Sequence, residues 1–248
     1  MPEPVVAVRD VCLTYHEKSG ETLAVDHVSF EVQQGEFVSI VGPSGCGKTS
    51  ILSLLAGLIP PSSGEIIRRA AEGYMLQRDH LLEWRTIEGN ILLGLQVKKG
   101  LDEGSREYAL SLLRSCGLEE FRRHYPRQLS GGMRQKVALI RTLAFSPELL
   151  LLDEPFSALD YQTRLKLADD VYQIIRSQNK TAILVTHDIS EAISMSNRVL
   201  VFSRRPARLK SEYHIALGAE RSPIARRNAP EFKDYFDRIW RDLDDAEE

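Results

Sequence analysis

The segment FVSIVGPSGCGKT, residues 37–49, decides the fold of this chain. It opens with a short apolar run typical of a buried strand and changes at Gly42 to a glycine-rich turn that ends in Lys48 and Thr49. The turn matches G-x-x-x-x-G-K-[ST], in which backbone N–H groups hold phosphate oxygens, the lysine reaches the β- and γ-phosphates, and the hydroxyl binds Mg²⁺. A helix is expected from Lys48 to about Leu58. The sequence therefore predicts a phosphate-binding loop between a strand and a helix, rather than a glycine-rich turn without a ligand.

Apolar runs and helical periodicity alternate along the rest of the chain, which predicts an α/β fold with a parallel sheet. From Thr86 to about Phe145 the periodicity is helical only, so we expect an inserted helical subdomain. The expected strands lie at 5–8, 28–32, 37–41, 73–76, 149–152, 181–186 and 199–202, and a further helix at 164–177.

Two acidic residues follow the apolar run at 149–152, namely Asp153 and Glu154. A carboxylate at the end of a buried strand can hold Mg²⁺, and its neighbour can orient or deprotonate an attacking water. The alternative is a pair that caps a following helix. The phosphate-binding loop in the same chain favours the catalytic interpretation.

A second glycine-containing turn, LSGGMRQ at residues 129–135, opens another expected helix. Ser130, Gly131 and Gly132 at a helix N-terminus form a potential anion site. A capped helix start with a flexible turn is the alternative. The chain thus has two potential phosphate-binding turns, and only the first carries the lysine motif. This combination suggests a composite site shared by two copies of the chain.

Composition excludes several classes of protein. The chain has 248 residues, 43% hydrophobic and 27% charged, which is typical of a globular protein. Its 32 basic and 35 acidic residues give a net charge of −3, so we expect no nucleic-acid partner. The three cysteines, Cys12, Cys46 and Cys116, have no metal-ligand spacing, and Cys12 and Cys116 are expected to fill the core. We expect no signal peptide, no membrane span and a cytoplasmic location.

These motifs, in this order, resemble the ATP-binding subunits of ABC transporters over nearly the whole chain. Besides the two turns and the acidic pair, the resemblance includes Gln77 in the Q-loop, SALD at residues 157–160, and a histidine, His187, after the strand at 181–186. The family implies a nucleotide-binding core with a mostly parallel sheet, an N-terminal antiparallel β subdomain and an inserted α-helical subdomain at about 86–146. It also implies an ATP-binding domain over residues 1–228, and we expect an amphipathic helix over 229–248 from the spacing described below.

The resemblance assigns roles to single residues. Glu154 is the expected general base and His187 the expected γ-phosphate contact, while Asp160 is expected to cross a dimer interface. Ser130, Gly131 and Gly132 are expected at the ATP of the opposite copy. Mg²⁺ is expected at Thr49, Gln77 and Asp153. The other expected ATP contacts are Tyr15, which stacks on adenine, and the loop residues Gly42, Pro43, Ser44, Gly45, Cys46, Gly47, Lys48, Thr49 and Ser50.

The segment LLEW, residues 81–84, is similar to the nitrate, sulfonate and taurine importers, although Glu83 stands where those proteins commonly have proline. The expected partners are two membrane permease subunits, a second ATP-binding subunit forming a homodimer, and an extracytoplasmic solute-binding protein. The expected place is the cytoplasmic face of the cell membrane. Importers of a thiamine precursor or of riboflavin-like substrates, and soluble ABC ATPases, remain alternatives. A GTPase or small-molecule kinase would leave the turn at 129–135 unexplained.

The C-terminal part has two features. The basic stretch Ser203–Arg227 is expected to be a solvated loop. After Pro230, apolar side chains recur at helical spacing from Phe232 to Leu243, which predicts an amphipathic helix. We expect its apolar face to pack on the same domain, with a dimer or permease contact as the alternative.

Overall fold

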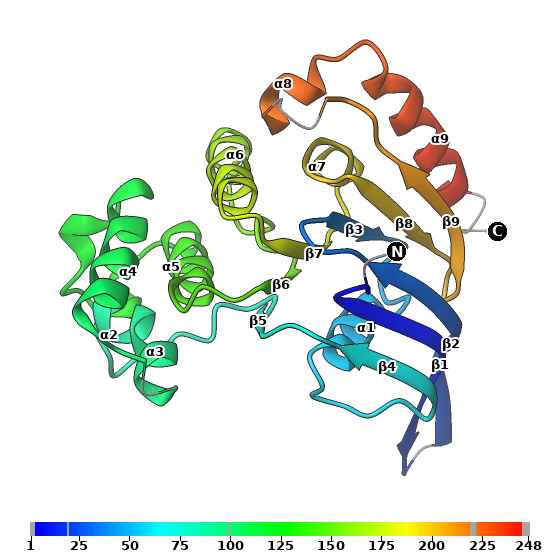
Figure 1. The fold of residues 1–248 in the computed structure, drawn as a ribbon, viewed down its shortest axis with the longest axis horizontal. Helices are drawn as coiled ribbons and strands as arrows, with labels where there is room; N and C mark the ends of the chain where they lie inside the picture. Colours follow the sequence, from blue (N-terminus) through cyan, green and yellow to red (C-terminus); the bar gives the residue numbers. More distant parts are fainter. Residues whose placement is uncertain (1–2, 19, 99, 219–221, 245–248) are drawn as a thin grey trace. The chain divides into compact units, whose positions relative to one another are not determined.

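The computed structural model describes residues 3–18, 20–98, 100–218 and 222–244. These fall into two compact units, one formed by residues 1–70 and 168–248 and the other by residues 71–167. Figure 1 shows the elements of each unit. The α/β fold predicted from the sequence is confirmed.

The first unit contains two groups of strands. β1 (Val6–Glu17) pairs antiparallel with β2 (Gly20–Val32) and with β4 (Ser63–Arg68). β3 (Phe37–Val41) lies between β7 (Thr181–Val185) and β8 (Arg198–Phe202), parallel to both, and β9 (Leu209–His214) pairs antiparallel with β8. Every residue of β3 and β7 is buried, as expected for parallel strands covered on both faces.

The helices of the first unit follow these strands. α1 (Lys48–Leu55) follows β3, and α7 (Ile189–Met195) follows β7. α8 (Pro223–Arg227) and α9 (Phe232–Asp244) are the last helices that the structure describes, and α9 lies beside β8 and β9 (Figure 1). Ile239 of α9 is buried in a cluster with α7 and β8, which confirms that the amphipathic helix packs on its own domain.

The stretch Ser203–Arg227 is not the solvated loop that its charge suggested. It contains β9 and α8, and Arg226 is 1% exposed, donating to the carbonyls of Ser194 (2.9 Å) and Ser196 (2.6 Å). The prediction was wrong because it counted charges without the alternation LKSEYH of β9, in which every second residue is half-buried.

The second unit is mainly helical. β5 (Glu72–Met75) and β6 (Leu149–Asp153) pair in parallel, with Met75 beside Leu152. Between them lie α2 (Ile87–Ile91), α3 (Leu93–Val97), α4 (Glu103–Ser115), two short 3₁₀ turns at Glu119–Phe121 and Pro126–Gln128, and α5 (Gly131–Ala144). α6 (Tyr161–Ser177) begins in this unit after Asp160. In the part of the chain that the structure describes, no helix is long and apolar enough to cross a membrane.

Candidate functional site

The predicted phosphate-binding loop lies between β3 and α1 and is built around its glycines. Gly45 and Gly47 have φ angles of +75° and +123°, in the region that favours glycine. A Cβ at Gly47 would lie 2.9 Å from the carbonyl oxygen of Ala24, so a side chain does not fit there. The sequence pattern G-x-x-x-x-G-K-T therefore corresponds to a loop whose backbone is free to surround an anion at the N-terminus of α1.

Lys48 is almost buried, and its Nζ donates to the carbonyl oxygens of Gly42 (2.7 Å) and Pro43 (2.9 Å). These bonds keep the ammonium group folded over the loop, where it is available to phosphate oxygens. Burial raises the pKa of the Cys46 thiol, although the charge of Lys48 opposes this shift. Cys46 is therefore a protonated, small loop residue and not a nucleophile.

Tyr15 of β1 is held next to this loop. Its hydroxyl donates to Ser50 Oγ at 3.0 Å, and its ring is partly exposed. Tyr15 and Ser50, both predicted nucleotide contacts, thus lie together in the first unit. The Tyr15 ring offers an aromatic face to a planar base.

His187 is placed by the turn that joins β7 to α7. The Thr186 hydroxyl donates to Glu191 Oε2 (2.7 Å), and the carboxylate of Asp188 accepts from the backbone N–H groups of Ser190 and Glu191. These bonds fix the backbone on both sides of His187 while its side chain stays exposed. The imidazole is therefore presented on a rigid turn.

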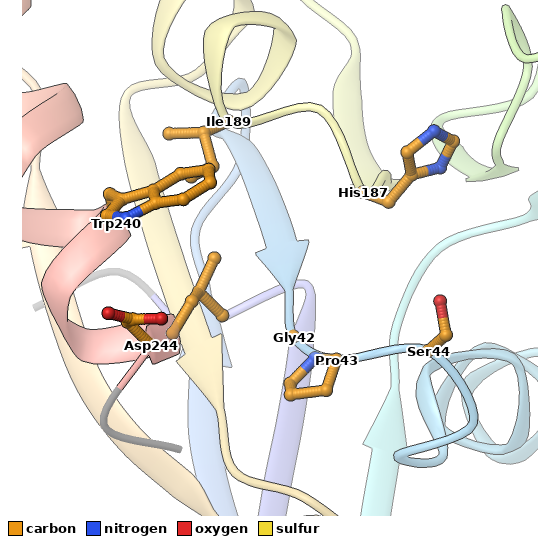
Figure 2. Close-up of a pocket in the computed structure, with 8 residues that line it drawn as sticks. Gly42, Pro43, Ser44, His187, Ile189, Trp240 and Asp244 are labelled. Atoms are coloured by element: carbon orange, nitrogen blue, oxygen red, sulfur yellow. The ribbon is translucent and has the colours of Figure 1, made fainter. Parts of the chain in front are cut away.

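A pocket of about 270 Å³ lies beside the phosphate-binding loop (Figure 2). Its lining includes Pro43 and Ser44 of the loop, His187, and, from α9, Trp240 and Leu243. Trp240 is 53% exposed and stacks on Phe236. The apolar periodicity of α9 included Trp240 but gave no sign that this helix reaches the loop.

The second unit holds the acidic pair and Gln77. Asp153 ends β6 and is 1% exposed, and Glu154 follows with a φ angle of +46°. Left-handed backbone at a non-glycine residue costs energy and is found preferentially at functional sites. Gln77 Nε2 donates to Glu154 Oε2 at 3.2 Å, so the structure brings these two predicted residues together. Asp160, predicted at a dimer interface, accepts from Thr163 N–H (3.0 Å) ahead of α6.

The turn at residues 129–135 forms the first turn of α5. Ser130 is the N-cap, and its Oγ accepts from the backbone N–H of Met133 at 3.4 Å. A Cβ at Gly132 would lie 2.9 Å from a methyl group of Leu159, whereas Gly131 faces open space. Gly132 is thus required by packing, and Ser130 and Gly131 are exposed at a helix N-terminus, where an anion is stabilised.

Comparison with known proteins agrees with these features. The sequence pattern of the family described as ABC transporter matches residues 25–157, more than half of the chain. The uncharacterized ABC transporter ATP-binding protein YtlC of Bacillus subtilis (strain 168) is 46% identical over 97% of this chain and 96% of that protein. The chain belongs to the ABC transporter ATP-binding family. As a member of that family it is an ATPase.

Two further comparisons add detail. The taurine import ATP-binding protein TauB of Yersinia pestis bv. Antiqua is 40% identical over 84% of this chain and 87% of that protein. The ATP-binding cassette MJ0796, solved as a dimer in a post-hydrolysis state bound to ADP and Pi, is 32% identical with a TM-score of 0.77. The match covers 85% of this chain and 99% of that cassette.

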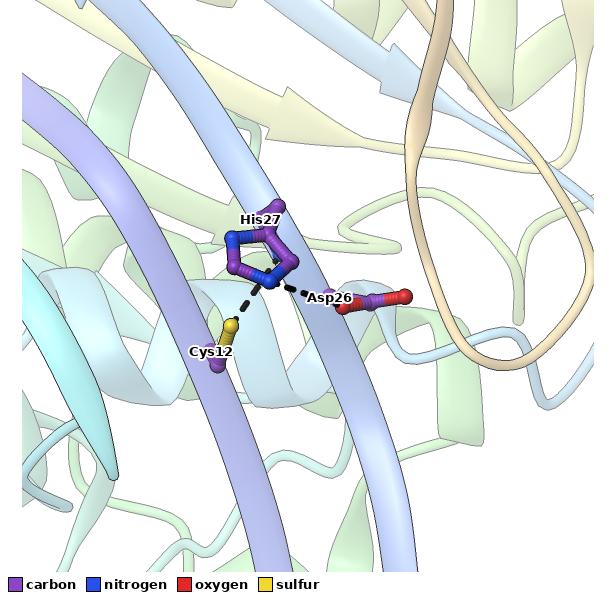
Figure 3. Close-up of side chains that lie close together, drawn as sticks. All are labelled: Cys12, Asp26 and His27. Carbon is purple, nitrogen blue, oxygen red and sulfur yellow. Dashed lines mark hydrogen bonds and ion pairs between the residues drawn. The ribbon is translucent and has the colours of Figure 1, made fainter.

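One cluster outside the ATPase motifs was not predicted. Cys12, Asp26 and His27 place one sulfur, oxygen or nitrogen atom each within 4.8 Å of one another (Figure 3). These groups already have partners, because His27 N–H donates to Cys12 Sγ, His27 Nδ1 pairs with Asp10 (2.7 Å), and Arg208 Nε donates to Asp26 (2.7 Å). We interpret the cluster as an ion-pair network that joins β1, β2 and the segment before β9. Cys12 is half-buried and belongs to this network instead of filling the core.

Proposed function

We propose that this ABC ATPase is the energy-coupling subunit of an importer for small anions of the nitrate, sulfonate and taurine type. The observation that carries the proposal is the exposed Trp84 in LLEW, the segment that in such importers receives a helix of the membrane subunit. Trp84 is 75% exposed, an unusual position for a tryptophan in a cassette with a buried core. The 40% identity to a taurine import protein supports the substrate class.

The residues of the two units have separate parts in ATP hydrolysis. In the first unit, Lys48 and the loop amides of residues 42–50 bind phosphates, Tyr15 stacks on adenine and His187 contacts the γ-phosphate. Exposed loop amides, an aromatic face and a rigidly presented imidazole fit a nucleoside triphosphate.

In the second unit, Glu154 is the general base, oriented by the hydrogen bond from Gln77. Thr49 of the first unit and Gln77 and Asp153 of the second would supply the oxygen ligands that Mg²⁺ prefers, and a bound Mg²⁺ would supply positive charge to the phosphates. Ser130, Gly131 and Gly132 bind the nucleotide of a second copy. This assignment makes the homodimer the active form.

The proposal also covers organisation and partners. We place the ATP-binding domain at residues 1–228, with the helical subdomain at about 86–146, and the amphipathic helix at 229–248. The partners are two permease subunits and a solute-binding protein, with the ATPase at the cytoplasmic face of the membrane.

Uptake measurements test the substrate class. Cells that lack this chain are supplied with the wild type or with Glu154→Gln, and uptake of labelled taurine, an alkanesulfonate and nitrate is measured. The proposal predicts that wild type restores uptake of at least one of the three and Glu154→Gln restores none. Equal uptake with both variants, for every anion, contradicts the proposed substrate class.

A further inference from the structure

The segment that carries Trp84 has no regular secondary structure but is tightly held. Residues 77–86, which we name the coupling segment, contain no helix or strand. Arg141 of α5 donates through Nη2 to the carbonyl oxygen of Asp79 (2.7 Å) and through Nη1 to that of His80 (2.9 Å). Two backbone carbonyls of the coupling segment are thus bonded to a single charged side chain of α5, the helix whose N-cap is Ser130.

Arg134, one turn after Ser130, makes a second connection. Its guanidinium binds Asp79 with two hydrogen bonds, Nε to Oδ2 at 2.9 Å and Nη2 to Oδ1 at 3.1 Å. Its Nη1 donates to Glu83 Oε1 at 2.8 Å. A bidentate arginine–carboxylate pair fixes orientation as well as distance, unlike a single exposed ion pair.

The charge of Arg134 keeps the Asp79 carboxyl group ionised. Partial burial tends to raise the pKa of Asp79, but hydrogen bonds from Arg134 and from the Leu81 N–H outweigh it and lower that pKa below its ordinary value. Asp79 is therefore ionised at neutral pH and keeps its bond to Arg134.

The other side of the coupling segment is held by Asn90 of α2, which is fully buried. Its Oδ1 accepts from Leu82 N–H (2.7 Å), and its Nδ2 lies within hydrogen-bond distance of the carbonyl oxygens of Leu82, Arg85 and Thr86. Trp84 is thus presented from a loop whose backbone is fixed at both ends.

Arg134 belongs to the turn at residues 129–135, and its backbone N–H donates to the carbonyl oxygen of Ser130 at 3.0 Å as the first helical hydrogen bond of α5. We propose that Asp79 and Glu83 are positioning residues that, through Arg134, transmit displacement of the coupling segment to the turn at Ser130. The inference rests on the proposed function, because the displacement comes from a permease bound at Trp84. It adds a named path between that surface and the nucleotide-binding turn.

Glu83 adds a second carboxylate to this path. Arg134 therefore has two carboxylate partners in the coupling segment, Asp79 and Glu83.

The first test uses the assembled transporter. ATPase rates of the subunit alone and of its complex with the permease are measured for wild type, Asp79→Asn and Asp79→Glu. The matched control is Glu88→Gln, because Glu88 also binds two arginines, Arg106 (2.8 Å) and Arg122 (2.6 Å), but does not touch the coupling segment. Thermal unfolding of all variants is recorded in parallel.

The inference predicts that Asp79→Asn lowers the ratio of permease-stimulated to basal rate at least fivefold. Asp79→Glu should keep at least half of the wild-type ratio, and Glu88→Gln should stay within twofold of it. A purely structural role for Asp79 would lower both rates together, and an unchanged ratio in Asp79→Asn overturns the inference.

The second test needs no partner. Deuterium uptake of residues 77–86 and 129–135 is measured with and without ATP in the subunit alone, in the Glu154→Gln background. We expect ATP to slow exchange in both segments, and to slow it only in residues 129–135 once Asp79→Asn is added. Equal slowing with and without Asp79→Asn overturns the inference. If no permease binds the wild type, the proposed function fails, and this measurement alone decides whether the two segments are coupled.

Discussion

The role of Asn90 in holding the coupling segment leads to a quantitative prediction. Replacing Asn90 by alanine removes the acceptor of Leu82 N–H, bonded at 2.7 Å, and the side-chain donor that the Arg85 carbonyl accepts at 3.2 Å. The carbonyls of Leu82 and Thr86 each keep a backbone donor, Arg85 N–H and Asn90 N–H respectively. A partly buried polar group that loses its partner costs about 1–3 kcal/mol, so two such groups give a loss of about 2–6 kcal/mol.

Urea unfolding of wild type and Asn90→Ala, followed by circular dichroism, measures this difference in the free energy of unfolding. Asn228→Ala is the matched control, because Asn228 is exposed and its side chain makes one 3.3 Å bond to the Ile224 carbonyl. We expect the control to change stability by less than about 0.5 kcal/mol. A loss below about 1 kcal/mol in Asn90→Ala would refute the claim that this side chain fixes the segment.

Three further predictions concern single charged groups. Lys48→Ala should weaken ATP binding roughly 10- to 150-fold, the loss of one charge-assisted hydrogen bond, measured by calorimetry; a change below fivefold contradicts its assigned role. The hydrogen bond to Asp10 raises the pKa of His27 above 6.5, so this pair stabilises the fold below pH 6.5 and the effect is lost as pH rises through the raised pKa. An NMR titration should show the His27 pKa falling in Asp10→Asn; an unchanged value counts against the pair. Arg226→Met should cost about 3 kcal/mol, since two buried carbonyls lose a charged donor, and a near-neutral change in urea unfolding is the opposing result.

The parts of the fold that the sequence predicts are those with an uninterrupted apolar run or a motif of fixed spacing. β3, β6, β7 and β8 each contain at least four consecutive buried residues, and in the sequence these residues form short apolar runs whose length indicates strands. β4 has the sequence SGEIIR and contains no fully buried residue. A strand of this kind depends on pairing with β1, a contact that local sequence does not reveal.

Some residues of the candidate site and of the coupling segment could likewise be predicted from the sequence, and others could not. Lys48 lies at the start of α1 and Asp153 at the end of β6, directly before Glu154. These are the positions that their motifs predicted. Asn90 and Arg141 were missed because they bind backbone carbonyls, and any segment offers such acceptors. Trp240 was placed on the correct helix, but its position beside the phosphate-binding loop depends on how α9 packs on β8.

Co-purification is the most direct test of the central claim that this ATPase energises an importer. Tagged Glu154→Gln is expressed in its native cell, membranes are extracted in mild detergent with ATP, and the proteins retained are identified by mass spectrometry. Trp84→Ala in the same background is the matched variant, because Trp84 is exposed and its replacement leaves the buried core intact. The account predicts that an integral membrane permease is retained by Glu154→Gln and depleted at least fivefold by the added Trp84→Ala. Retention of soluble partners alone would contradict it.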